Sequence, residues 1–272
     1  MKKFFSHLVL LSVCLVFLLP IFAVLSTSLK SSEQIYQSEF HWIPSPIVWS
    51  NYYEAISKIN FTKCLFNTLY LAVFNIFGVV IASSLAAYAF SVLNWKFREF
   101  FFLVTLATIM LPEMVLMVPQ FLLFKSLGWY GTLLPLLAPY FCGLPFYIFL
   151  LRQFFLSIPK DLADSARIDG AGEIQIWWDL YMPLARPALM VVALFQFLIS
   201  WNDLLKPSIF LIDENQYTLS LALQQFQSRL GGAEWGPLMA ITLIMALPII
   251  MLFLITQKYF VRGIAVSGLK EG

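Results

Sequence analysis

The stretch SIPKDLADSARIDGA, residues 157–171, stands inside a polar segment, residues 153–187, that separates long apolar runs. Ser157 is a candidate N-cap, Pro159 suits the first turn of a helix, and Asp169-Gly170 is a turn signal. The segment holds at least seven charged side chains in a sequence that otherwise has few, so it belongs in water. The pattern predicts a short helix followed by a turn.

A second helix is predicted directly after that turn. From Gly172 to Tyr181 the apolar side chains recur at spacings of three and four residues, and they are Ile174, Trp177, Trp178 and Tyr181. Pro183 and Pro187 then interrupt the chain before the next apolar run. The segment is therefore expected to form a helix, a turn and a helix with one apolar face.

The rest of the sequence has the composition of a membrane protein. Of 272 residues, 60% are hydrophobic and 12% charged, and the mean hydropathy is +0.82. Soluble domains average about 25% charged residues. The fold class predicted is all-α, a polytopic membrane protein. Its spans use nearly all of the chain, which leaves no room for a separate soluble catalytic domain.

Six apolar runs are long enough to cross a hydrocarbon core of about 30 Å. They are residues 5–27, 67–92, 100–124, 133–152, 188–210 and 237–259, within one transmembrane domain that covers residues 1–272. The first run is longer than the apolar region of a signal peptide and lacks a convincing cleavage site, which favours a retained span.

The distribution of basic residues predicts the orientation. With six spans and a cytoplasmic N-terminus, eleven basic residues lie inside: Lys2, Lys3, Lys96, Arg98, Arg152, Lys160, Arg167, Arg186, Lys258, Arg262 and Lys270. Six lie outside: Lys30, Lys58, Lys63, Lys125, Lys206 and Arg229. The excess inside favours two cytoplasmic termini and places the 153–187 segment in the cytoplasm.

Several kinds of site are missing from the sequence. It has no GxxxxGK loop for nucleotide phosphates, and His7 and His41 belong to no catalytic or metal-binding pattern. The three cysteines form no CxxC pair, and the scattered basic residues suggest no nucleic-acid surface. We therefore expect a chain that is not an enzyme, with no catalytic residues, metal site or cofactor of its own.

Polar residues within the spans are candidates for a transport path, because ionisable groups there are costly. Glu113 follows Pro112 in the third span and either faces a cavity or satisfies backbone groups that the proline frees. Gln196, Ser200 and Asn202 in the fifth span are further candidates for binding hydroxyl groups, although solvation of a helix end explains the neighbouring Asp203 equally well.

The polar segment resembles the EAA loop of ABC importer permeases. Asp164-Ser165-Ala166 stands for the EAA triplet, Asp169-Gly170 for the DG pair, and Pro183-Leu184 with Pro187 for the exit. Matches along the rest of the chain resemble the carbohydrate-uptake permeases of the maltose and glycerol-phosphate type. They are Asn67-Thr68-Leu69, Ala86-Ala87-Tyr88-Ala89-Phe90, Pro112 with Pro119, Leu127-Gly128, Trp201-Asn202, Phe260-Val261-Arg262-Gly263 and Gly268-Leu269-Lys270.

The resemblance implies a complex of several chains in the bacterial inner membrane. A second permease, two ATP-binding cassette subunits that bind ATP and Mg, and an external solute-binding protein would assemble with this chain, and a sugar or sugar derivative would be the cargo. The implied contacts with the ATPase are Asp161, Leu162, Asp164, Ser165, Ala166, Arg167, Asp169 and Gly170. Leu162, Ala166 and Ile168 would be buried on the partner, and Asp164 and Arg167 would hydrogen-bond to it.

Three other readings stay open. The 153–187 segment is compatible with a helix lying on the inner leaflet, although its acidic residues outnumber Lys160 and Arg167. Permeases for polyamines or phosphonates share the loop. A secondary transporter would need internal repeats, which the two halves of the sequence do not show.

Overall fold

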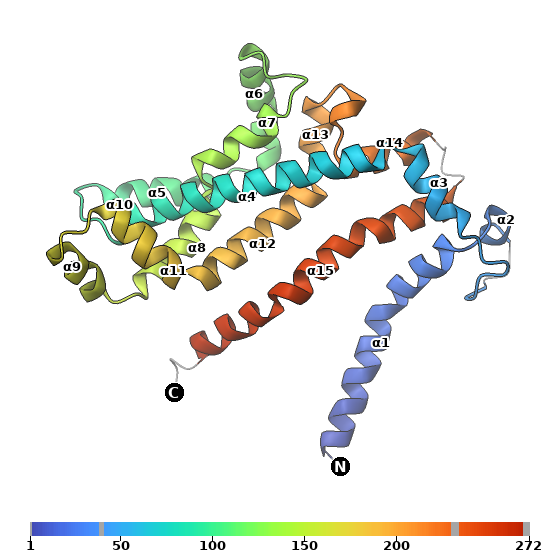
Figure 1. The fold of residues 1–272 in the computed structure, drawn as a ribbon, viewed down its shortest axis with the longest axis horizontal. Helices are drawn as coiled ribbons and strands as arrows, with labels where there is room; N and C mark the ends of the chain where they lie inside the picture. The colour runs from blue at the N-terminus through green and yellow to red at the C-terminus, as the bar shows by residue number, and fades with distance from the viewer. Residues whose placement is uncertain (1, 38–40, 230–233, 269–272) are drawn as a thin grey trace. The chain divides into compact units, whose positions relative to one another are not determined.

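The computed structural model describes residues 2–37, 41–229 and 234–268, and the regular elements of the described residues are all helices (Figure 1). Leu269 and Lys270, which belong to the match at residues 268–270, lie outside these residues. Lys270 was also counted among the inside basic residues. Contacts within the chain gather into two compact units. One comprises Met1–Cys64 with Leu219–Met251, and the other comprises Leu65–Thr218 with Leu252–Gly272.

In the first unit, the helix that begins at Ser50 bonds to the C-terminal end of the first helix. The elements of this unit are α1 Lys2–Ser28, α2 Ser32–Ile35, α3 Ser50–Lys58, α14 Leu219–Arg229 and the first part of α15 Trp235–Gly268. The side-chain amide of Asn51 donates to the carbonyls of Ser28 and Lys30, at 2.9 Å each, which satisfies backbone groups left over where α1 ends. Ala55 packs with Ala240 and Ile241 in a small buried core.

The second unit contains the polar segment and most of the buried core. Its elements are α4 Phe61–Ser91 (from Leu65), α5 Arg98–Ile109, α6 Glu113–Ser126, α7 Leu134–Leu137, η1 Ala138–Cys142, α8 Pro145–Leu156, α9 Lys160–Ile168, α10 Glu173–Gln175, the π-helix η2 Ile176–Tyr181, α11 Met182–Leu184, α12 Arg186–Asn202, α13 Leu205–Phe210 and η3 Glu214–Gln216. Tyr181 meets Tyr88 of α4 and Phe155 of α8 edge-on, with ring centroids 5.1 and 5.3 Å apart.

Length and composition allow four spans in the described residues, or up to six if each of two bent helix pairs is one span. The predicted runs 5–27 and 237–259 fall within α1 and α15, and the runs 67–92 and 133–152 match α4 and residues 134–156 to within one residue at one end. The run 100–124 is divided into α5 and α6, which meet at 98°. Pro112 explains this break, because its extended backbone precedes α6 and it lacks an N–H.

Small residues let the connection before α8 approach α4 closely. The backbone N–H of Leu144 donates to the Ser83 hydroxyl at 3.1 Å. A Cβ at Gly143 would lie 3.4 Å from the backbone of Ala82 and Ser83, and the φ of Gly143 is +77°. Glycine is therefore required at residue 143 by both the close approach and the backbone conformation.

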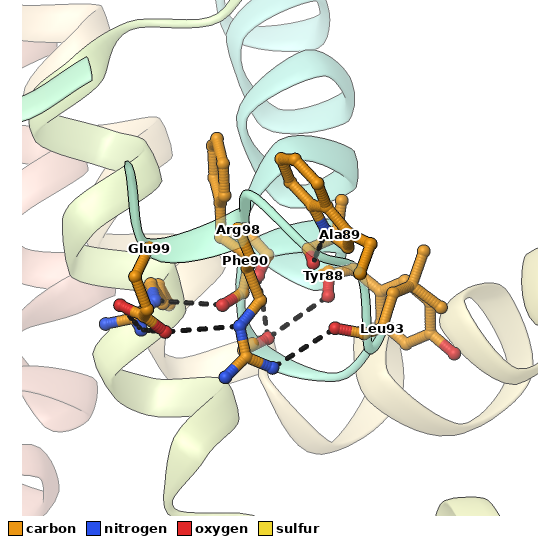
Figure 2. A network of polar contacts seen from close by, with 10 residues as sticks. Tyr88, Ala89, Phe90, Leu93, Arg98 and Glu99 are labelled. Atoms are coloured by element: carbon orange, nitrogen blue, oxygen red, sulfur yellow. Dashed lines mark hydrogen bonds and ion pairs between the residues drawn. The ribbon is translucent and has the colours of Figure 1, made fainter. Parts of the chain in front are cut away.

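A polar cluster joins α5 and α8 to the end of α4 (Figure 2). The guanidinium of Arg152 donates to the Phe90 carbonyl at 3.0 Å and to both oxygens of Glu99 at 3.0 and 3.1 Å. It also lies 4.0 Å from the ring centroid of Phe102. Arg98 donates to Glu99 and to the Leu93 carbonyl, each at 3.1 Å. Three helices therefore share Arg152, which the sequence had marked only as a topological charge.

We expect Arg152→Met to destabilise the protein by about 1.5 to 3 kcal/mol, because hydrogen bonds to a charged group and the contact with Phe102 are lost together. The unfolding midpoint in detergent measures the effect. Lys96→Met, at an exposed position between α4 and α5, is the control and should change stability by no more than about 0.5 kcal/mol. Equal midpoints for the two variants would contradict this role of Arg152.

Candidate functional site

Helix α9 is the first element that begins in the polar segment, and its residues Ala163 and Arg167 border a pocket together with Val92, which directly follows α4. It begins at Lys160 after Pro159, so the prediction that Ser157 caps it was wrong. Ser157 instead ends α8, where its hydroxyl donates to the Phe154 carbonyl at 2.6 Å. The physical reason is that the extended backbone of Pro159 separates the two helices. Asp161 in the first turn and Arg167 in the last suit the helix dipole.

The end of α9 is a Schellman turn built on Gly170. The N–H of Ala171 donates to the Ala166 carbonyl and the N–H of Gly170 to the Arg167 carbonyl, both at 3.0 Å. The φ of Gly170 is +88°, in the region that favours glycine. The turn predicted at Asp169-Gly170 is confirmed.

The two faces of α9 differ. Ala163 is buried, and the half-buried Ala166 packs against the core of its own chain. Leu162 and Ile168 are 44% and 87% exposed, as expected of side chains that contact a partner. The remaining exposed members of the predicted docking set are Asp161, Asp164, Ser165, Asp169 and Gly170. Of the three apolar residues assigned to a partner, Ala166 thus contributes to this chain's core instead, since it shares the inward face with Ala163.

Arg167 links α9 to the helix bundle. Its guanidinium donates to Asp164 at 2.6 Å and to the two oxygens of Glu173 at 2.7 and 3.2 Å. The hydroxyl of Tyr88 in α4 donates to the same Glu173 carboxylate at 2.5 Å. These hydrogen bonds form a continuous path from α9 to α4. The hydrogen bonds from Arg167 lower the pKa of Glu173, so that the carboxylate stays charged at neutral pH.

Sequence reasoning found some members of this path but not the path itself. Arg167 and Asp164 were expected to bond to a partner, yet they bond to one another and, through Arg167, to Glu173. Glu173 carried no signal of its own. Tyr88 was visible only as part of the motif at residues 86–90. The glycine turn brings Arg167 and Glu173 together, because it reverses the chain between them.

The second half of the polar segment contains a π-helix, Ile176–Tyr181, and this changes which of its apolar side chains are buried. Ile176 and Tyr181, five residues apart, are both buried, as is Trp177. Ile174 and Trp178 are exposed, so only half of the predicted apolar face is correct. The backbone hydrogen bonds of a π-helix join residues i and i+5, so its turn is wider than the three to four residues assumed, and this shifts the buried positions.

Two candidates for the transport path line one polar pocket in the second unit. Glu113 in the first turn of α6 and Asn202 at the end of α12 border a cavity of about 270 Å³, together with Met117, Ile199, Asp203, Leu204, Leu205 and Lys206. The ammonium of Lys206 lies 2.6 Å from a Glu113 carboxylate oxygen and 3.2 Å from the Tyr140 hydroxyl. Glu113 therefore faces a cavity and also bonds to a side chain from another helix.

The other two candidates, Gln196 and Ser200, are buried away from this pocket. The Gln196 amide donates to the Ser200 hydroxyl at 3.0 Å, and the side-chain amide of Asn75 in α4 donates to the same hydroxyl at 3.2 Å. The Asn75 and Gln196 carbonyl oxygens accept no hydrogen bond from the described residues. These side chains join α4 to α12, a packing role that their spacing in the sequence did not reveal.

Comparisons with known proteins agree with this architecture. Residues 75–266 match the family described as binding-protein-dependent transport system inner membrane component. The chain is 33% identical over 259 residues to the arabinooligosaccharides transport system permease protein AraQ of Bacillus subtilis (strain 168), covering 94% of this chain and 92% of that protein. It is 29% identical over 274 residues to the sn-glycerol-3-phosphate transport system permease protein UgpE of Yersinia enterocolitica, covering 97% and 96%.

A solved structure extends the likeness to three dimensions. A chain of a bacterial ABC transporter involved in the import of the acidic polysaccharide alginate superposes with a TM-score of 0.83 at 27% identity, covering 95% of this chain and 96% of that chain. With a family match over most of its length, and with helices long and apolar enough to cross a bilayer, this chain belongs to the inner membrane components of binding-protein-dependent transport systems, the permease subunits of ABC importers.

Proposed function

We propose that this permease subunit forms half of a path for a sugar or sugar derivative, and that ATPases docked on the 153–187 segment drive it. The observation that carries the proposal is helix α9, which exposes Leu162 and Ile168 while Arg167 ties it to the bundle. Exposed apolar side chains on a short cytoplasmic helix fit a groove on a partner. Motion of that partner would reach α4 through Glu173 and Tyr88.

The topology that accompanies this function has six spans and two cytoplasmic termini. Both compact units would belong to one membrane domain, with the α5–α6 pair as a broken third span. Broken helices are tolerated in membranes where they line a cavity. Helix α6 does so, because Glu113 and Met117 border the pocket. Helix α12 connects the proposed docking segment to the pocket. It begins at the end of residues 153–187 and reaches the pocket after 17 residues, about 25 Å.

The complex proposed contains three further subunits and a binding protein. They are a second permease, two ATP-binding cassette subunits that bind ATP and Mg, and an external solute-binding protein, as the family description implies. Docking on the ATPase is assigned to α9 and its turn: Asp161, Leu162, Asp164, Ser165, Ala166, Arg167, Asp169 and Gly170. Closure of the ATPases would move α9 as a lever and shift the bundle between inward-open and outward-open states.

A saccharide is the cargo that similarity favours. The relatives AraQ and UgpE are named for arabinooligosaccharides and glycerol phosphate, and the structural relative imports alginate. A permease for a polyamine or phosphonate is the alternative within the family, and a secondary transporter is the alternative outside it.

Co-purification tests the docking assignment. We expect a tagged chain, expressed with a second permease and an ATPase from its own gene cluster, to bring both down from detergent. Leu162→Asp combined with Ile168→Asp should release the ATPase and retain the second permease, because both side chains are exposed on α9 and a charge there opposes burial in a groove.

The matched control is Ile43→Asp, which places the same charge at an exposed isoleucine outside the 153–187 segment and should retain the ATPase. If the native chain purifies without an ATPase, the proposed function is wrong. If the double variant still holds the ATPase, the docking surface lies elsewhere.

A further inference from the structure

The polar pocket lies where two helices are interrupted. Between α5 and α6 the axis turns by 98°, and Glu113 is the first residue after the break. Helix α12 ends at Asn202, and the extended residue Asp203 leads into α13. The cavity of about 270 Å³ thus lies beside the α5–α6 break and the end of α12, the kind of discontinuity at which membrane transporters bind solutes.

The pocket holds more acidic than basic groups, and these groups already bond to one another. Its ionisable lining groups among the described residues are two carboxylates, Glu113 and Asp203, and one ammonium, Lys206. The ammonium bonds to Glu113 at 2.6 Å and to the Tyr140 hydroxyl at 3.2 Å, and an Asp203 oxygen accepts the backbone N–H of Lys206 at 3.2 Å. Whatever the protonation state of Asp203, the pocket has no excess of positive charge.

This inventory favours a ligand that is polar and uncharged. A carboxylate or phosphate on the ligand would meet Glu113, whose side chain is 65% exposed, with no spare cation to balance it. A cationic ligand would compete with Lys206 for Glu113, and Asp203 already accepts the backbone N–H of Lys206. Hydroxyl groups meet neither obstacle. They donate to Glu113 and accept from Lys206, and the Asn202 amide can serve either role.

We propose that this pocket binds the hydroxyl groups of a neutral saccharide and discriminates against saccharides that carry carboxylate or phosphate groups. The inference rests on the proposed function and deepens it, because it assigns a charge class to the cargo at Glu113, Asn202 and Lys206.

Equilibrium dialysis of the purified complex, without the binding protein, tests the assignment directly. Omitting the binding protein removes the selection it would impose. The probes are arabinotriose, a trisaccharide of mannuronate, glycerol 3-phosphate and spermidine. We expect arabinotriose to bind at least tenfold more tightly than any of the three charged probes.

Three variants locate the binding in the pocket. Asn202→Ala removes an exposed amide that bonds only within its own helix turn, and it should weaken arabinotriose binding severalfold. Lys206→Met should weaken it tenfold or more, since a charged donor is lost. Glu113→Gln with Asp203→Asn leaves one cation and no anion, and should improve binding of the mannuronate trisaccharide at least tenfold. Lys125→Met, an exposed cation outside the pocket, should change neither affinity.

The outcomes separate this inference from the proposed function. Binding of a charged probe as tight as that of arabinotriose, absence of arabinotriose binding, or an effect of Lys125→Met equal to that of Lys206→Met would each overturn the pocket assignment. None of them touches the proposed function, which stands or falls on ATP-driven uptake by the same preparation in proteoliposomes with its binding protein.

Discussion

ATP-driven uptake is expected to be lost in Gly170→Val, while the chain still inserts and still assembles with a second permease. The turn after α9 needs a φ of +88°, which a β-branched residue adopts only at a cost of about 1 to 3 kcal/mol. No neighbouring atom lies within 4 Å of a Cβ built at this position, so the effect comes from backbone strain and not from crowding. Uptake in proteoliposomes should fall tenfold or more.

Two further substitutions test that explanation. Gly170→Asn should retain part of the uptake, because asparagine tolerates the left-handed region better than valine. Gly172→Ser is the matched control two residues away: Gly172 has a φ of −75°, open space for a Cβ and an N-cap position where serine is favoured. Normal uptake by Gly170→Val, or equal losses at both glycines, would disprove a role for the turn.

Arg167→Met is expected to uncouple ATP hydrolysis from uptake with a loss of tenfold or more. Removal of the guanidinium leaves the Asp164 and Glu173 carboxylates without their shared donor and cuts the path from α9 to Tyr88. The measurement is the number of solute molecules imported per ATP hydrolysed. Tyr88→Phe keeps the edge-on contact with Tyr181 but removes one hydrogen bond, so its loss should be smaller.

A charge exchange distinguishes the internal pair from a contact with the ATPase. If Arg167 acts through Glu173, Arg167→Glu combined with Glu173→Arg should recover more uptake than either change alone. Recovery should be absent if Arg167 instead bonds to the ATPase, and that result would refute the path. Because Arg167 lowers the pKa of Glu173, this carboxylate's contribution is present at neutral pH and is lost only as the pH falls through that lowered pKa. Coupling through the pair should thus be constant between pH 6 and pH 8.

Much of the docking element could be predicted because its signals are local. Asp169-Gly170 marked a turn, and the structure has a Schellman turn there. The charged segment between apolar runs predicted a solvent-exposed helix, and α9 spans Lys160–Ile168. The start of α9 at Lys160 instead of Ser157 was missed, because capping preferences rank residues without showing where the preceding helix ends.

The pocket could be predicted only in part. Glu113 and Asn202 stood out as polar residues within apolar runs, and both line the cavity. Gln196 and Ser200 stood out for the same reason, yet they are buried between α4 and α12 with Asn75. Lys206 was counted only as an outside charge. Sequence periodicity places a side chain on a helix face but does not say which other helix that face meets.

Hydropathy, turn chemistry and the EAA-like pattern identify a helical membrane subunit with an exposed polar segment, because each of these signals depends on residues close together in the chain. Helix packing was needed to show that Tyr88 bonds to Glu173, that Lys206 bonds to Glu113, and that Arg152 joins three helices. The two residues of each of these pairs are between 53 and 93 positions apart in the sequence, and they meet only when helices pack. The physical reason is that packing depends on how all the helix faces fit at once, which no single stretch of sequence encodes.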